Sequence, residues 1–362
     1  MADGAGESSM AIVDKASPLS AFREVRWSGH NLQGRDFSGA DLTGADLSES
    51  DLSNANLAGA RLIGARLCRA KLIGADLMGA DATGADLSDA DLTSARLEGA
   101  RLHYTQASRI IVREANLNRL DARAATLVGA RVSASDLGDA LLCGADLSHA
   151  TFEGVGLAKA DLARARCVSA EFVGVNLAES NLTEADFTNA VLQYADLTKV
   201  SAPGVVWHET VMNGARFRLA DLSHATFSGV TAHGVVMERA NLRFAQFNGV
   251  DAERAIFDFA NLERARLSSS IFRHASLVGA YLVEAFARSC EFTGADFFWA
   301  ELATFVQDNC TTLGARLPES TRIVRGPRAA LPPAVPIQRL SRIASDDRSG
   351  LLGNLLPPQS PA

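Results

Sequence analysis

Long hydrophobic runs are missing from this 362-residue chain, and so is the usual signature of secretion. No stretch of about 18 apolar residues occurs, which argues against a membrane-spanning helix. The first residues, MADGAGESSMAIVDK, show no basic region followed by an apolar one, so we expect no ordinary secretory signal. The two absences together predict a cytoplasmic protein.

Cysteine and aromatic residues are also sparse. The five cysteines are odd in number, widely spaced and free of any C-x-x-C pair, which indicates free thiols in a reducing compartment. Cys167 and Cys290 fall at positions that we expect to face the interior. Aromatic residues make up 6% of a chain that is 47% apolar, which predicts a narrow core of small and aliphatic side chains.

Signatures of catalysis and of cofactor binding are absent as well. Glycine is abundant, but no G-x-x-x-x-G-K-S/T or G-x-G-x-x-G motif follows a strand and opens a helix. The histidines are too scattered to suggest a metal site, and the many aspartates recur at a fixed spacing, as structural positions do. We therefore predict that the protein is not an enzyme, has no catalytic residues and binds neither a cofactor nor a metal.

What the chain does have is a five-residue unit repeated in one register. In residues 39–67, GADLTGADLSESDLSNANLAGARLIGARL, each central Leu follows a polar residue and, one position earlier, a small one. The central positions run from Phe22 to Leu302 without an insertion or deletion. On a helix, a period of five would drift by about 140° per unit, so the central row would wander round all sides. Each unit is therefore predicted to be a very short strand plus a corner, where glycine is favoured.

Ala, then Asp or Asn, then Leu or Phe is a motif that resembles the pentapeptide repeat family over most of the chain. The resemblance implies an all-β fold, a right-handed quadrilateral β-helix (a solenoid) with four units per coil and about 14 coils. The residues support four walls independently, because Asp41, Arg61 and Asp81 alternate in sign at the spacing of one coil. We expect residues 20–317 to form this solenoid, roughly 70 Å long at the usual strand spacing.

The two ends of the chain differ from the repeats in composition. Residues 1–19 are predicted to be a disordered segment with a short N-terminal cap, and residues 318–362 a flexible tail containing Pro and Arg. Some covering is needed at each end, because a solenoid otherwise exposes its apolar core and its unpaired strand edges.

The units lose their regularity between Thr105 and Val132. Ala107 takes a central position that is usually large, while Ile110 takes a position that is usually small. Large-for-small exchange within a coil conserves volume, so we predict continuous coils there rather than a break.

Apolar residues replace charged ones at outward positions in the second half of the chain, and an exposed apolar strip usually marks an interface. Such a strip could contact one or more protein partners, a second copy in a homodimer, or the chain's own tail, Pro327–Ala362. The predicted partner-binding residues are Leu219, Phe244, Phe259, Tyr281, Phe286, Phe298 and Trp299.

The family resemblance implies two possible roles. Some pentapeptide repeat proteins look like accessory components of bacterial secretion systems, including type VI systems, which suits the predicted non-catalytic protein-interaction scaffold. The alternative is a DNA-mimicking protein that binds DNA gyrase or topoisomerase IV and confers inhibitor resistance. A net charge of −7 weakens the alternative, because duplex DNA about 70 Å long carries about −40. We expect no direct contact with nucleic acid.

Overall fold

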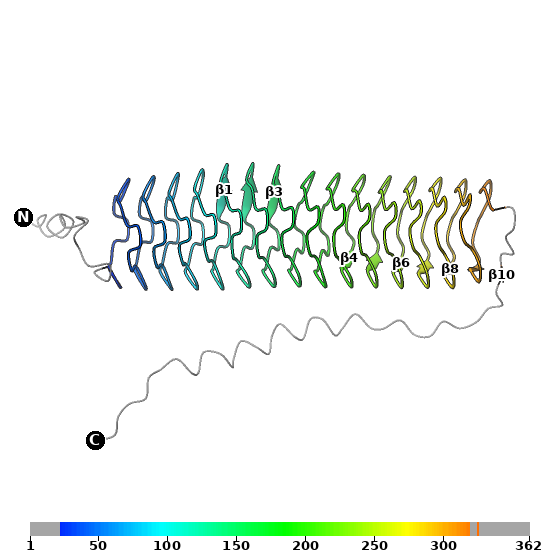
Figure 1. Ribbon diagram of the computed structural model, residues 1–362, viewed down its shortest axis with the longest axis horizontal. Coiled ribbons are helices and arrows are strands. Elements are labelled where there is room, and N and C mark those ends of the chain that lie inside the picture. Colours follow the sequence, from blue (N-terminus) through cyan, green and yellow to red (C-terminus); the bar gives the residue numbers. More distant parts are fainter. Residues whose placement is uncertain (1–21, 319–323, 326–362) are drawn as a thin grey trace, which may run out of the picture. The chain divides into compact units, whose positions relative to one another are not determined.

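The computed structural model describes residues 22–318 and 324–325, and these form a solenoid of stacked coils (Figure 1). Residues twenty apart pair as parallel bridges, from Arg26 with Asp46 to Asp296 with Arg316. Each coil therefore takes four five-residue units, and each unit supplies one wall. The described ranges contain no helix. The predicted all-β, four-sided β-helix is confirmed.

We number the walls by their order along a coil. Wall 1 contains the central residue Leu42 and every twentieth residue before and after it, and walls 2, 3 and 4 contain Leu47, Leu52 and Leu57 in the same way. A corner follows each wall, and the last residue of each unit lies at it.

Two walls hold short extended strands. Wall 3 carries a three-stranded parallel sheet, and wall 2 a seven-stranded one in the order β10-β9-β8-β7-β6-β5-β4 (Figure 1). Strand β10 leaves the twenty-residue register, because Val324 pairs with Val306 and extends wall 2 past the last coil. The strands are β1 (Ile111–Arg113), β2 (Arg131–Ser133), β3 (Thr151–Glu153), β4 (Val206–His208), β5 (Thr226–Ser228), β6 (Gln246–Asn248), β7 (Arg266–Ser268), β8 (Phe286–Arg288), β9 (Val306–Asp308) and β10 (Val324–Arg325).

Backbone hydrogen bonds between neighbouring coils hold the stack together. The Leu42 N–H donates to the Arg61 carbonyl at 2.8 Å, and the Arg61 N–H returns a bond to the Ala40 carbonyl at 2.9 Å. The corner adds a third bond, from the Gly44 N–H to the Ile63 carbonyl at 2.9 Å. Three of the five N–H groups in a unit thus bond to the adjacent coils, which satisfies the backbone without long strands.

The two remaining N–H groups explain the sequence of the unit. The Ala45 N–H donates to the Leu42 carbonyl at 3.0 Å and closes the corner. The Thr43 N–H points away from both neighbouring coils, and the carboxylate of Asp41 accepts its hydrogen bond at 3.1 Å. Asp or Asn therefore precedes the central residue because its short side chain accepts a hydrogen bond from the one N–H group of the unit that has no backbone partner.

The interior contains the small residue and the central residue of each unit, and nearly all of these are buried between Phe37 and Phe305; toward the ends of the stack Arg35, Cys310 and Thr312 are partly or fully exposed. Large aromatic rings occupy the core of the second half. Phe187 stacks on Trp207 with ring centroids 4.6 Å apart, and Phe227 stacks on Phe247 at 4.7 Å. Rings in register on neighbouring coils add offset-stacking attraction to the burial of apolar surface.

Three aromatic rings cluster at the N-terminal end of the solenoid. Phe22, Trp27 and Phe37 have centroids between 5.5 and 6.0 Å apart, so they cover the N-terminal end of the apolar core. The predicted N-terminal segment, residues 1–19, lies outside the described residues. So does the predicted tail, residues 318–362, apart from Pro318, Val324 and Arg325.

The irregular repeats form continuous coils, as predicted. Gln106 pairs with Thr126, and β1 pairs with β2 in the ordinary twenty-residue register. Volume compensation is incomplete, however, because a cavity of about 30 Å³ remains in the core there, lined by Ile110, Val112, Leu120, Val132 and their apolar neighbours.

Candidate protein-interaction surface

Four of the seven predicted partner-binding residues lie at one edge of the solenoid. Leu219, Phe259 and Trp299 share the corner that follows wall 4, two coils apart from one another, and Phe298 precedes Trp299 on wall 4 itself. Leu219 and Phe259 are each 51% exposed and Trp299 is 71% exposed. These three side chains therefore present apolar surface to solvent instead of filling the core.

The other three predicted residues belong to different walls. Tyr281 lies on wall 1, Phe244 at the corner after wall 1, and Phe286 on wall 2 at the start of β8. Of the three, only Tyr281 counts among the exposed large apolar residues. The seven residues were predicted as one strip, whereas the coils distribute them over two corners and three walls.

Wall 4 also holds apolar residues outside the seven predicted partner-binding residues, and of these Val236 and Ile256 are outward apolar positions already visible in the sequence. Val236 pairs with Ile256 on neighbouring coils, both with outward side chains, and Val278 lies one coil beyond Ile256, toward Phe298. We call these residues, together with the edge aromatics, the wall 4 patch: Val236, Ile256, Phe259, Val278, Phe298 and Trp299. Ile256 and Phe259 belong to the same five-residue unit, so the register alone places them on neighbouring parts of the surface.

The aromatic rings of the wall 4 patch are held in place by their neighbours. The Phe259 ring lies over Gly279 of the next coil, and the Arg239 guanidinium stands 5.8 Å from its centroid. Phe298 stacks on Trp299 at 4.6 Å, and the Arg316 guanidinium lies 3.8 Å from the Phe298 centroid. Stacking and cation–π contacts of this kind restrict the aromatic side chains, which reduces the conformational entropy lost when a partner binds.

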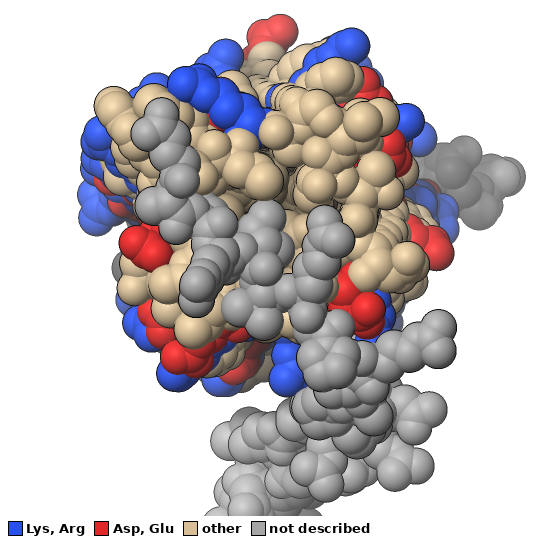
Figure 2. Space-filling model, turned by 90° about the vertical axis from the view of Figure 1, so that its right-hand side faces the viewer, with Lys and Arg blue, Asp and Glu red and all other residues tan. Residues whose placement is uncertain are grey.

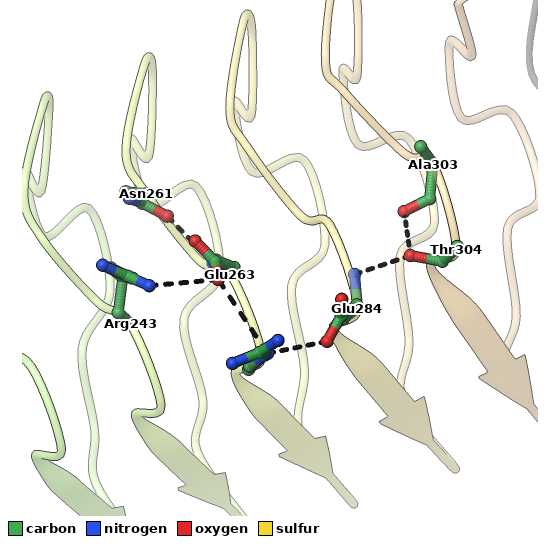
Figure 3. A network of polar contacts seen from close by, with 7 residues as sticks. Arg243, Asn261, Glu263, Glu284, Ala303 and Thr304 are labelled. Carbon is green, nitrogen blue, oxygen red and sulfur yellow. Dashed lines mark hydrogen bonds and ion pairs between the residues drawn. The ribbon is translucent and has the colours of Figure 1, made fainter.

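A network of charges lies on wall 1 and at the corner that follows it (Figure 3). Arg243 and Glu263 approach to 3.1 Å, and Arg264 and Glu284 to 2.6 Å. The Thr304 hydroxyl oxygen accepts a hydrogen bond from the Glu284 N–H at 3.0 Å. The charged groups on this side of the solenoid therefore already pair with one another.

Phe244 is part of the same charged corner. Its ring stacks on His224 with centroids 4.9 Å apart, and the Arg264 guanidinium lies 5.7 Å from its centroid on the next coil. Both faces of the ring therefore already have partners within the chain, which leaves Phe244 little apolar surface to offer another protein.

Ion pairs along the columns cancel much of the surface charge. Arg66 lies 3.7 Å from Asp46, and Arg101 lies 3.8 Å from Asp81, each pair joining neighbouring coils. Seen from its C-terminal end, the solenoid carries acidic and basic side chains interleaved around the rim, with uncharged residues between them (Figure 2). No large surface of a single sign is present in that view.

Two cysteines that the sequence analysis treated as unrelated are in contact. Cys290 and Cys310 are one coil apart, and the Cys290 N–H donates to the Cys310 sulfur at 3.4 Å. The same twenty-residue spacing that aligned the charges could have found this pair. Cys167 and Cys290 are buried, as predicted.

The described residues contain neither a group of side chains suited to a metal ion nor a candidate membrane span. Within residues 22–318 and 324–325, no three His, Cys, Asp or Glu side chains are grouped so that they could hold a metal ion. The same residues include no helix with the length and apolar character needed to cross a bilayer.

The chain was also compared with known proteins. Overlapping segments between residues 21 and 302 match the family described as pentapeptide repeats, with gaps at 100–134 and 167–169. The larger gap coincides with the irregular coils. None of the curated proteins matches the chain.

Several solved structures are similar to the chain. HetL, a pentapeptide repeat protein involved in heterocyst differentiation regulation from the cyanobacterium Nostoc, is 28% identical, covering 76% of this chain and 91% of its own, with a TM-score of 0.26. A trypsin-treated form of QnrB1, a plasmid-mediated fluoroquinolone resistance protein, is 15% identical over 63% of this chain and 90% of its own, with a TM-score of 0.35. Rfr23 from the cyanobacterium Cyanothece is 18% identical over 42% of this chain and 90% of its own, with a TM-score of 0.16.

Proposed function

Since this chain belongs to the pentapeptide repeat family, we propose that it is a non-catalytic scaffold that binds another protein through the wall 4 patch. The observation that carries the proposal is the exposure of Phe259 and Trp299 at corners where a large residue has no structural use. Aromatic residues beside arginine are the side chains that most often dominate the energy of protein interfaces.

The backbone at these corners strengthens the argument. Phe259 and Trp299 have φ values of 57° and 61°, in the left-handed region that favours glycine. The same corner carries glycine at Gly39, Gly59 and Gly79 in the first coils. A bulky residue there costs roughly 1 kcal/mol in backbone strain and returns little burial. The same corner also carries Arg119 and Lys159 at positive φ, so the fold tolerates side chains there, but it gives no reason for a large apolar one, which a binding role would supply.

The patch also indicates the chemistry of the partner. Arg239 is exposed above the Phe259 ring, and no ion pair between described residues includes it. A carboxylate on the partner, next to an apolar surface that covers Phe259 and Trp299, would pair with this guanidinium in a partly desolvated site. We therefore propose a folded protein partner with an apolar contact surface and an acidic residue at its edge.

A pair of charge substitutions tests the proposal. Phe259→Asp with Trp299→Asp should abolish capture of the partner from host extract, because two carboxylates would be buried against apolar surface. Tyr104→Asp is the matched control, since Tyr104 is also an exposed aromatic residue at a corner but lies far from the patch along the stack. A partner retained by the double variant would overturn the proposal.

Light scattering on the same proteins tests homodimerisation. If the wild type is a dimer and the double variant a monomer, the patch contacts a second copy, and the proposed foreign partner is wrong. The cytoplasmic location and a role in a bacterial secretion system, type VI in particular, stay predictions from the sequence and the family resemblance.

The gyrase-binding alternative has less support. Pairs such as Asp46 with Arg66 and Asp81 with Arg101 neutralise the columns that a DNA mimic would need to keep negative. A supercoiling assay with purified gyrase checks this alternative directly. We expect neither inhibition of the enzyme nor protection from fluoroquinolones at micromolar protein.

A further inference from the structure

Cys290 and Cys310 occupy the same inward position on the last two coils of wall 3. Besides the bond from the Cys290 N–H to the Cys310 sulfur, the Cys290 thiol lies 3.4 Å from the Arg288 carbonyl. The Cys310 thiol lies 3.5 Å from the carbonyls of Ala287 and Asp308. The Cys310 sulfur therefore contacts the coil of Cys290 as well as its own, and the Cys290 sulfur contacts a carbonyl of its own coil.

The spacing of the coils suits a bond between the two sulfurs. Parallel strands in register are about 4.8 Å apart, and disulfides join residues whose Cα atoms are about 4.4 to 6.8 Å apart. Thr311 donates its N–H to the Cys290 carbonyl at 2.9 Å, so the backbone already holds the two residues in register. The spacing between the two coils therefore lies within the range of Cα separations that a disulfide can span.

The two thiols differ in access and in acidity. Cys290 is 2% exposed, whereas Cys310 is partly exposed in the last coil. A hydrogen bond between the two side chains lowers the pKa of Cys310 to about 7 and raises that of Cys290. Cys310 thus supplies an accessible thiolate near neutral pH, the form that reacts with oxidants and disulfides.

We propose that Cys290 and Cys310 form a reversible oxidation site that closes a disulfide between the last two coils. The oxidant is a small-molecule disulfide of the glutathione type. The Cys310 thiolate attacks one of its sulfurs, which breaks the S–S bond and releases the other half as a thiolate. Cys290 then loses its proton to solvent and attacks the Cys310 sulfur, releasing the second half. Two protein thiols are oxidised, and one disulfide is reduced to two thiols.

The second step is the slower one, because Cys290 is buried and its thiol resists deprotonation. A mixed disulfide on Cys310 therefore accumulates before the loop closes.

The closed loop would contain the coil that carries Phe298 and Trp299. A link between Cys290 and Cys310 prevents this coil from separating from the stack, at the end where fraying is easiest. Oxidation would thus stabilise part of the wall 4 patch, although the oxidation site itself does not depend on the proposed binding function.

Peptide mapping of the full chain tests the proposal. The protein is equilibrated with oxidised glutathione, its remaining thiols are alkylated, and it is digested with trypsin. Both cysteines fall in one peptide, residues 289–316, because Arg288 and Arg316 flank a stretch without Lys or Arg. We expect this peptide to lose about 2 Da and to take up no alkylating agent. Cys68, Cys143 and Cys167 should not form a disulfide with either residue.

Single substitutions distinguish the order of steps. Cys290→Ser should retain glutathione on Cys310, because no resolving thiol remains, whereas Cys310→Ser should leave Cys290 unmodified. Cys143→Ser is the control and should close the loop as the wild type does. Alkylation of both residues in the oxidised wild type, or glutathione retained on Cys310 at equilibrium, would overturn the proposal.

Discussion

The ring of Phe259 lies directly over Gly279, one coil further along the chain, where a Cβ atom would come within 2.6 Å of it. The same arrangement occurs at Tyr194 over Gly214 and at His274 over Gly294. At these three corners a large ring is accommodated by the absence of a side chain at the same corner of the next coil. This pairing connects the repeat sequence to the orientation of the proposed binding surface.

Replacing Gly279 by Ala should therefore disturb Phe259 as well as the backbone. The left-handed corner alone costs roughly 1 kcal/mol for Ala, and displacement of the ring adds to this loss of stability and weakens partner binding. Gly59→Ala is the matched control, because Gly59 lies at the same corner with open space around its Cβ position. Urea unfolding should show the larger loss for Gly279→Ala. In a Phe259→Ala background the two losses should become equal, and a persistent difference would contradict the role of the ring.

Reversing a charge in a column should destabilise the stack slightly. Arg66→Glu places a third carboxylate between Asp46 and Asp86, its neighbours on the adjacent coils. Because these side chains are exposed, we expect a small decrease in melting temperature that shrinks at high salt. Arg66→Gln removes the attraction without adding repulsion, and its effect should be intermediate. Equal melting temperatures at low salt would count against electrostatic coupling between coils.

Acid should weaken the solenoid through its aspartates. Hydrogen bonds from Thr43 and Ser48 lower the pKa of Asp41 and Asp46 from the ordinary value of 3.8. A carboxylate with a depressed folded pKa stabilises the fold above its unfolded pKa, and this contribution is lost as the pH falls through the folded value. Stability should thus decline below about pH 4.

Variants that lack the two hydroxyl groups test the cause of this decline. Thr43→Val combined with Ser48→Ala should raise the pKa of both carboxyl groups and reduce the pH dependence of unfolding by urea. An unchanged pH dependence would mean that these hydrogen bonds do not matter to stability.

The core cavity offers a way to stabilise the chain. Val132 lines the space of about 30 Å³ among the irregular coils, and Val132→Ile adds one methylene group to it. We expect a gain of up to about 1 kcal/mol in the free energy of unfolding. Val205→Ile is the control, because Val205 is fully buried and does not line the cavity, so the added group should be neutral or destabilising there. A loss of stability for both variants would show that the irregular coils are already tightly packed.

Much of the candidate site could be read from the register. Stepping by twenty from Phe259 leads to Gly279 and Trp299, and the same step from Cys290 leads to Cys310. A search for cysteines close together along the chain misses this pair, because its contact lies across coils. Tyr281 and Phe286 were predicted as partner-binding residues together with the edge aromatics, although their positions in the register place them on walls 1 and 2.

The sequence by itself determined the course of the backbone, because a period of five without insertions allows only one wall per unit, and the small and central residues must face inward. It also determined which side chains become neighbours one coil apart. Only the tertiary structure decided how the exposed side chains lie: Phe259 with its ring over Gly279, Phe244 between His224 and Arg264. The repeat spacing fixes the position of each Cα atom. The side-chain rotamer depends on the free space and the charged groups that surround it on the neighbouring coils.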